Sequence, residues 1–228
     1  MREDSTRGTV VFDIIGTCFS LKKVEAALAG AGAGPPALEL WFSQTLRDAF
    51  ALSLSGGYQP LKSVLQAELP RTLKQLGVQV PQNVAQIVST FGELDAQPGF
   101  TELVGRLAGD GWKMLALTNS SADATRKLLE RVGVADRFKA LLSCDSIEKT
   151  KPHPDVYAMA RREAEGETWM VAAHAWDIAG AARAGFRTAF IAKLESAYLD
   201  IYPKPDLVVQ ELSQVGDAIR QATRVAST

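Results

Sequence analysis

The stretch Thr9-Val10-Val11-Phe12-Asp13-Ile14-Ile15-Gly16-Thr17 determines how the remainder of the sequence is interpreted. Apart from Asp13, residues 9–15 are β-branched or aromatic, without the polar and apolar alternation that marks a half-exposed strand. Continuous runs of this kind are typical of strands buried on both faces of a parallel sheet. We therefore expect the first core strand here, with Asp13 near its carboxyl end.

Three later apolar runs repeat this signature and are separated by helical patterns. They span residues 111–117, 169–173 and 187–191. Alternation of strands with helices predicts a parallel sheet that is covered by helices on both faces. The expected helices span residues 99–107, 122–132, 154–163, 178–184 and 212–222.

The 80 residues from Cys18 to Gln97 interrupt this alternation. A simple crossover to a parallel neighbour needs only about a dozen residues. Apolar side chains recur within this segment at steps of three and four, which indicates several packed helices. We expect residues 18–97 to form a small helical cap domain, and residues 1–17 and 98–228 to form the core domain.

The composition excludes several classes of function. The chain has 228 residues, 46% of them hydrophobic, and its 25 Lys and Arg nearly balance its 26 Asp and Glu, so neither disorder nor nucleic-acid binding is expected. No apolar run approaches the roughly 18 residues of a membrane span, and no signal peptide is evident. Cys18 and Cys144 lack partners at metal-ligand spacing. We expect a cytoplasmic protein with free thiols.

Polar residues gather at the expected carboxyl ends of the strands, where parallel sheets bind ligands. They are Asp13, the segment 118–121, Lys151 in a loop with two prolines, His174 and Asp177. Each has an ordinary structural explanation as a turn residue, a helix cap or a solvated charge. Together they supply two carboxylates, a cation and a hydroxyl–amide pair, the set required for catalysis by a carboxylate nucleophile.

Four segments in this order resemble the motifs of the haloacid dehalogenase superfamily, and most closely those of its type II L-2-haloacid dehalogenase branch. The resemblance implies an α/β fold in which a Rossmannoid parallel-sheet catalytic core carries a helical cap of the C1 type, inserted after the first motif. The segments are Phe12-Asp13-Ile14-Ile15-Gly16-Thr17, Leu117-Thr118-Asn119-Ser120, Lys151-Pro152-His153-Pro154-Asp155-Val156-Tyr157 and Ala175-Trp176-Asp177-Ile178-Ala179-Gly180-Ala181.

The resemblance also implies a role for each matching residue. Asp13 would attack the substrate carbon and form an ester, while Thr17 and Thr118 or Asn119 hold the carboxylate and the leaving group. Lys151 would keep Asp13 ionised, because a cation within about 4–6 Å lowers the pKa of a carboxyl by about 1–3 units. Asp177 would hold Lys151 and help to orient the water that cleaves the ester.

Ile15 and Ala173 distinguish between branches of the superfamily. Phosphatases of the superfamily carry a second Asp two residues after the nucleophile as a general acid and base, and Ile15 can do neither. Ala173 replaces an acidic residue common in metal-binding members, which leaves only Asp13 and Asp177 as ligands if Mg²⁺ is bound. We expect carbon–halogen hydrolysis without a cofactor. A Mg²⁺-dependent phosphatase or phosphonatase-like hydrolase, or a non-catalytic binding module, stays as the alternative.

Two positions depart from the branch. Its members have an Arg after a Trp in the first part of the cap, but Trp41 is followed by Phe42, a candidate pocket wall. Arg47 is a candidate replacement, although it lies about 140° around a helix from Phe42. His174 stands in place of Asn, and it could act as a base toward water or, when protonated, as a partner for a carboxylate or halide. The resemblance implies a small-molecule substrate, either a 2-halo acid or a phosphorylated metabolite. It is compatible with a homodimer, and the physiological substrate stays open.

Overall fold

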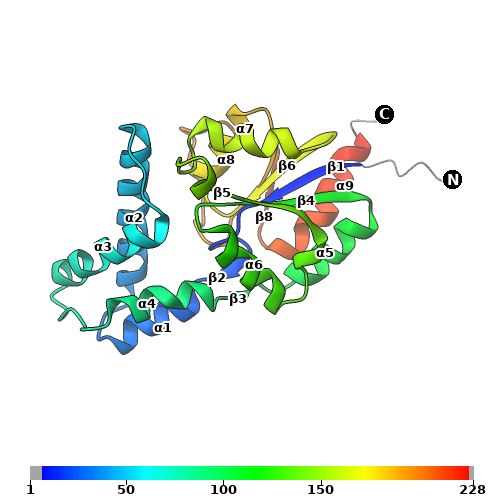
Figure 1. The fold of residues 1–228 in the computed structure, drawn as a ribbon. Coiled ribbons are helices and arrows are strands. Elements are labelled where there is room, and N and C mark those ends of the chain that lie inside the picture. Colours follow the sequence, from blue (N-terminus) through cyan, green and yellow to red (C-terminus); the bar gives the residue numbers. More distant parts are fainter. Residues whose placement is uncertain (1–6, 226–228) are drawn as a thin grey trace.

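A six-stranded parallel sheet forms the centre of the structure, a computed structural model that describes residues 7–225 (Figure 1). Its strand order is β5-β4-β1-β6-β7-β8, and every neighbouring pair runs parallel. The expected α/β class is therefore confirmed. The strands are β1 (Gly8–Phe12), β4 (Trp112–Thr118), β5 (Phe138–Ser143), β6 (Glu167–Ala172), β7 (Arg187–Ile191) and β8 (Leu207–Val209).

The first strand lies in the middle of the sheet, between β4 and β6, and all its residues are buried. It is shorter than the expected strand at 9–15, because the chain leaves the ladder after Phe12. Gly16 then turns the chain with a φ of 85°, a conformation that glycine adopts without strain. Asp13 consequently lies just beyond the carboxyl edge of the sheet, while its backbone N–H still donates to Val171 O.

Helices cover both faces of the sheet (Figure 1). Val10 and Phe12 pack into a cluster with α5, α6 and α9, whereas Val11 points to the opposite face and packs with α7 and α8. Several expected helix boundaries move by up to three residues. α8 starts three residues early, so that Asp177 lies in its first turn, and the last helix is preceded by a 3-10 turn at 212–214. The helices are α5 (Phe100–Gly109), α6 (Ala122–Arg131), α7 (Pro154–Glu163), α8 (Ala175–Arg183) and α9 (Val215–Val225).

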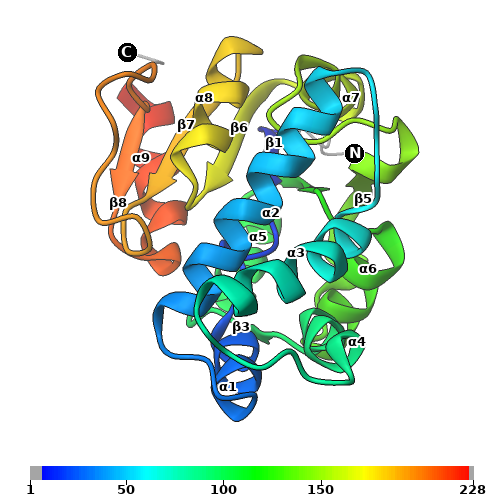
Figure 2. The ribbon, with the colours of Figure 1, turned by 90° about the vertical axis from the view of Figure 1, so that its left-hand side faces the viewer.

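Four helices form the long segment after β1, as its apolar spacing predicts. A two-stranded antiparallel ladder of β2 (Phe19–Ser20) and β3 (Asp95–Ala96) joins the start and the end of this segment to the core. Figures 1 and 2 show the four helices on the side of the sheet where the parallel strands end, with α2 in front of that edge. The helices are α1 (Lys22–Gly30), α2 (Pro36–Leu54), α3 (Leu61–Gln75) and α4 (Val84–Ser89).

Three contacts tie α2 and the loop that follows it to the carboxyl edge of the sheet. The Phe50 and Trp176 rings meet edge to face with their centroids 5.2 Å apart, and the backbone N–H of Thr150 donates to Ser53 Oγ at 3.2 Å. In the loop after α2, the Tyr58 hydroxyl donates to Asp145. The inserted helices thus cover the strand ends directly. Within residues 7–225, no helix is long and apolar enough to cross a membrane.

Replacement of Gly180 by alanine tests how closely α7 and α8 pack. A Cβ added at Gly180 would lie 2.6 Å from Cζ of Tyr157, so the two helices would have to separate. Overpacking of this kind typically destabilises a protein by about 1–3 kcal/mol. We expect urea denaturation of Gly180→Ala to show a loss of unfolding free energy in this range.

Gly105→Ala in α5 is the matched control. A Cβ added at Gly105 meets nothing within 4 Å. Because alanine favours the helix over glycine by about 0.5–1 kcal/mol, this variant should be as stable as the wild type or slightly more stable. A Gly180→Ala protein that behaves like Gly105→Ala would contradict the packing described here.

Candidate active site

A fully buried ammonium group holds the ends of three core segments together. Lys151 Nζ donates to Asp13 Oδ1 at 2.8 Å, to Asp177 Oδ2 at 2.7 Å and to Leu117 O at 3.0 Å. The Lys151 side chain is 0% exposed, so water cannot replace these partners. Burial of an ion is unfavourable unless charge and hydrogen bonds compensate it, and three acceptors use all three N–H groups of the lysine.

The residues that follow β4 and β5 position this lysine. Asn119 Oδ1 accepts a hydrogen bond from the backbone N–H of Lys151 at 2.9 Å and one from the Cys144 thiol at 3.1 Å. Thr118, the last residue of β4, accepts from the backbone N–H of Ser120 at 3.0 Å. Thr118 and Asn119 thus shape the loop around Lys151, and both also line the pocket in front of Asp13.

Asp13 is buried and ionised. Its Oδ2 accepts a hydrogen bond from Thr17 Oγ1 at 2.6 Å, and Thr17 in turn accepts from the backbone N–H of Ala173 at 2.9 Å. Burial alone would raise the pKa of Asp13, but the positive charges of Lys151 and His174 and the hydrogen bonds from Lys151 and Thr17 together outweigh that effect and hold the pKa below its ordinary value. The carboxylate form that a nucleophile requires is therefore the stable one.

Asp177 supports the lysine from the first turn of α8. It is fully buried, and its second oxygen, Oδ1, accepts from the Tyr157 hydroxyl at 2.6 Å. Burial and the nearby charge of Asp13 raise the pKa of Asp177 despite the opposing effect of Lys151. Tyr157 is a site residue that the sequence did not single out, although it belongs to the segment that starts at Lys151.

His174 lies on the other side of Asp13, at the start of α8. Its Nδ1 is 3.4 Å from Glu195 Oε1, and its ring stacks on Trp176 with the centroids 5.4 Å apart. Its Nε2 is 4.0 Å from Asp13 Oδ2 and makes no hydrogen bond to any described residue. Glu195 is also fixed, because its Oε2 accepts from the backbone N–H of Ala175 at 3.0 Å.

The pocket in front of Asp13 is small and mostly apolar. Its free volume is about 10 Å³, close to what one water molecule needs. Phe42 forms part of its wall, as expected, with its ring 6.3 Å from the His174 ring between centroids. The lining residues are Asp13, Ile15, Phe42, Leu46, Leu61, Thr118, Asn119, Ser120, His174 and Trp176.

Arg47 lies outside this pocket. Its side chain is 53% exposed, and its guanidinium binds the neighbouring Asp48 through Nε at 2.7 Å and Nη2 at 3.0 Å. Its position therefore does not support the expectation that Arg47 contributes to the substrate site. The direction follows from the helix: five residues after Phe42, a side chain on α2 faces away from the pocket.

Asp13 and Asp177 do not form a site that fits Mg²⁺. Each of their four oxygens already accepts a hydrogen bond, and the Lys151 ammonium lies between the two carboxylates, where a bridging cation would have to sit. Among residues 7–225, no group of three or more His, Cys, Asp or Glu side chains could hold a metal ion. The oxygen atoms available at this site therefore do not support the alternative of a Mg²⁺-dependent phosphatase or phosphonatase-like hydrolase.

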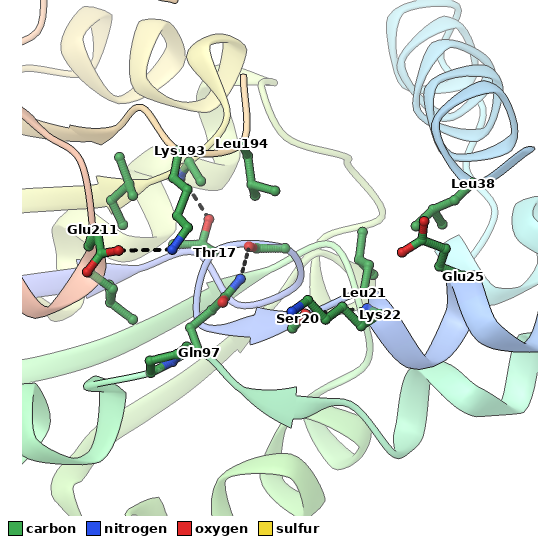
Figure 3. Close-up of a pocket in the computed structure, with 15 residues that line it drawn as sticks. Thr17, Ser20, Leu21, Lys22, Glu25, Leu38, Gln97, Lys193, Leu194 and Glu211 are labelled. Carbon is green, nitrogen blue, oxygen red and sulfur yellow. Dashed lines mark hydrogen bonds and ion pairs between the residues drawn. The ribbon is translucent and has the colours of Figure 1, made fainter. Parts of the chain in front are cut away.

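A larger cavity of about 400 Å³ lies next to this pocket, at the base of the inserted helices (Figure 3). Thr17 borders it, and the ion pair of Lys193 with Glu211, at 2.9 Å, lies on its wall. Neither Asp13 nor His174 lines it. Because the groups that can react face the smaller pocket, we assign the active site there despite its size.

Comparisons with known proteins agree with this geometry. Residues 8–185 match the family model of a haloacid dehalogenase-like hydrolase. An (S)-2-haloacid dehalogenase from Xanthobacter autotrophicus is 29% identical over 196 residues, which cover 83% of this chain and 77% of that protein. An (S)-2-haloacid dehalogenase from Pseudomonas putida is 24% identical over 214 residues, which cover 91% of this chain and 94% of that protein.

The fold also matches solved structures. The structure of L-2-haloacid dehalogenase from Xanthobacter autotrophicus with chloropropionic acid covalently bound superposes with a TM-score of 0.83 at 25% sequence identity. The match covers 93% of this chain and 98% of that chain. These findings confirm the resemblance that the four sequence motifs carry.

Replacement of Lys151 by methionine tests the central ion group. The variant keeps the volume of the side chain but removes the ammonium group that lies between two buried carboxylates, so we expect urea denaturation at neutral pH to show a loss of about 3–5 kcal/mol in unfolding free energy. Acidification should reduce the difference in unfolding free energy between the wild type and the variant, because protonation neutralises the unpaired carboxylates in the folded variant.

Lys127→Met on the exposed face of α6 is the control for this substitution, and it should change stability by less than about 0.5 kcal/mol. A Lys151→Met protein with wild-type stability at every pH would show that the ammonium does not hold these segments together.

Proposed function

Because this chain belongs to the haloacid dehalogenase-like hydrolase family, we propose that it hydrolyses the carbon–halogen bond of a small 2-haloalkanoic acid, without a metal, through an ester on Asp13. The observation that carries this proposal is the buried, ionised carboxylate of Asp13 in a pocket with mostly apolar walls. A desolvated carboxylate is a strong nucleophile, and apolar walls suit both the carbon chain and the halogen.

In the first step, Asp13 Oδ2 attacks C2 of the acid. The new C–O bond forms as the C–halogen bond breaks, and the halide leaves with the electron pair. Lys151 and Thr17 orient the carboxylate through their hydrogen bonds of 2.8 and 2.6 Å. A halide leaves without a proton, so Ile15 can stand where the superfamily's phosphatases need an acid.

In the second step, water attacks the carbonyl carbon of the ester. The bond between this carbon and the former Oδ2 breaks, the 2-hydroxy acid leaves with that oxygen, and a proton passes to solvent. Because Oδ1 stays against Lys151 Nζ, the ammonium stabilises the negative charge that builds on this oxygen. Asp13 returns as a carboxylate that contains one oxygen from water.

Asp177 serves the lysine rather than the water. It is fully buried, and both its oxygens accept hydrogen bonds, from Lys151 and from Tyr157. The sequence analysis expects Asp177 both to hold Lys151 and to help orient the water. The proposed mechanism assigns it only the first of these two roles. The negative charge of Asp177 balances the lysine while Asp13 is neutral in the ester.

The inserted helices act in this proposal as a cap, formed by residues 18–97. The pocket has only about 10 Å³ of free volume, so a haloacid enters only after α2 moves away from the strand ends. The two short strands β2 and β3 are the connections about which such a movement would occur. Closure over the bound acid excludes bulk water and strengthens the interaction of Lys151 with the developing charge.

The proposed reaction needs no partner protein or nucleic acid. We place the enzyme in the cytoplasm, and this placement is supported by Cys18 and Cys144, which are buried free thiols as in a reducing compartment.

Halide release from L-2-chloropropionate in the presence of EDTA tests this function. We expect the wild-type protein to release chloride at the same rate with and without EDTA, because no step uses a metal. The Asp13→Asn variant should lose activity by about three orders of magnitude or more, since removal of a nucleophile has effects of that size.

The EDTA condition and the Asp13→Asn variant distinguish this function from its alternatives. Activity that EDTA abolishes would identify a metal-dependent enzyme, whereas equal release by the wild type and Asp13→Asn would exclude Asp13 as the nucleophile. No release at high enzyme concentration would contradict the haloacid proposal itself.

A further inference from the structure

The proposed substrate is an anion, and the pocket needs a group that recognises it. Lys151 cannot provide that group, because Asp13, Asp177 and the Leu117 carbonyl already accept all three of its N–H bonds. Arg47 is exposed and paired with Asp48. Among the described residues that line the pocket, only His174 can carry a positive charge.

The position of His174 leaves one ring nitrogen available to a ligand. Its side chain is 12% exposed and lines the pocket, and Nε2 is buried with no hydrogen bond to any described residue. Buried polar atoms in folded proteins nearly always have a partner, so an unpartnered nitrogen at a pocket indicates a place for a ligand atom. Phe42 and Trp176 pack against the ring and fix its direction.

Glu195 determines which protons the ring carries. Its carboxylate can only accept, so Nδ1 must be the protonated nitrogen that faces it at 3.4 Å. In a neutral ring, Nε2 would then present a lone pair toward the Asp13 carboxylate 4.0 Å away, which is repulsive. In the charged ring, Nε2 presents an N–H instead, on the side of Asp13 Oδ2 and of the pocket that both residues line.

The charges around the ring favour this second form. The groups that face His174 are Glu195 after β7, Asp13 after β1 and Asp177 in α8, and all three are acidic. Burial would lower the pKa of His174, but the hydrogen bond with Glu195 and the negative charge of Asp13 outweigh it and raise the pKa above the ordinary value.

We propose that His174, held by Glu195 as an imidazolium, binds the substrate carboxylate through its Nε2–H. This inference rests on the proposed function, since it names the group that recognises the acid on which Asp13 acts. Glu195 is a positioning residue in this account: it does not line the pocket, and it acts on the ligand through the His174 ring. Charge-assisted hydrogen bonds of this kind are stronger than neutral ones, so an acid should bind in preference to its neutral amide.

Equilibrium binding of propionate and propionamide tests this assignment without any turnover. The two ligands have nearly the same shape, differ in charge and contain no halogen, so the intact wild-type protein can be titrated with both by calorimetry. We expect the wild type to bind propionate about tenfold more tightly than propionamide. His174→Gln should reduce this preference to less than about twofold, and Glu195→Gln should reduce it severalfold.

Two further variants control for the loss of a carboxylate and for misfolding. Glu25→Gln removes an exposed carboxylate from α1 and should leave the preference unchanged. His174→Asn provides a second substitution at the ring position, and thermal unfolding of every variant identifies any that fail to fold. With L-2-chloropropionate as substrate, KM should rise about tenfold in His174→Gln, more than kcat falls, because the carboxylate contact is made in both the bound and the reacting state.

Each outcome decides one claim. A folded His174→Gln or His174→Asn protein that keeps the preference for propionate, or a wild type without that preference, would overturn the assignment of His174. A Glu195→Gln protein that prefers propionate over propionamide as strongly as the wild type does would overturn the positioning role of Glu195. A wild type that prefers propionate but releases no halide would contradict the proposed reaction and leave the carboxylate site intact.

Discussion

The contact of one buried ammonium with two carboxylates is the interaction on which this structure depends. Lys151 joins the residue after β1, the end of β4 and the first turn of α8 at distances of 2.7 to 3.0 Å. Loss of Lys151 would leave two buried carboxylates without their ammonium partner, so the three segments have to meet in one arrangement. That arrangement keeps the Asp13 carboxylate ionised, ordered and directed at the pocket.

Lys151 and His174 have different electrostatic roles at the site. Lys151 is saturated by protein acceptors and therefore acts on Asp13. The Nε2 of His174 makes no hydrogen bond to any described residue, and it lies 4.0 Å from Asp13 Oδ2 at the pocket that both residues line. Phe42 of α2 and Trp176 of α8 provide apolar surface beside these groups. Low polarity strengthens both interactions, because fewer water molecules compete with the charges.

The sequence predicted the elements with strong local signals and missed those set by distant contacts. β7 and α7 match their expected ranges, since a continuous apolar run and a proline-started helix need no further context. β5 was missed because an edge strand shows partial exposure and no continuous apolar pattern, and β8 has only three residues. Motif positions identified Asp13, Lys151 and Asp177, but nothing local indicates Glu195, whose approach to His174 depends on where the chain turns after β7.

The most direct test of this account is a single turnover of L-2-chloropropionate in water enriched in oxygen-18, with the enzyme in excess. Formation and hydrolysis of an ester on Asp13 would place the heavy oxygen in the Asp13 carboxylate and leave the hydroxyl of the product unlabelled. Mass spectrometry of the peptide that contains Asp13 and of the 2-hydroxy acid measures both. Heavy oxygen in the product, with none in Asp13, would mean that water attacks the substrate directly and would contradict the role assigned to this carboxylate.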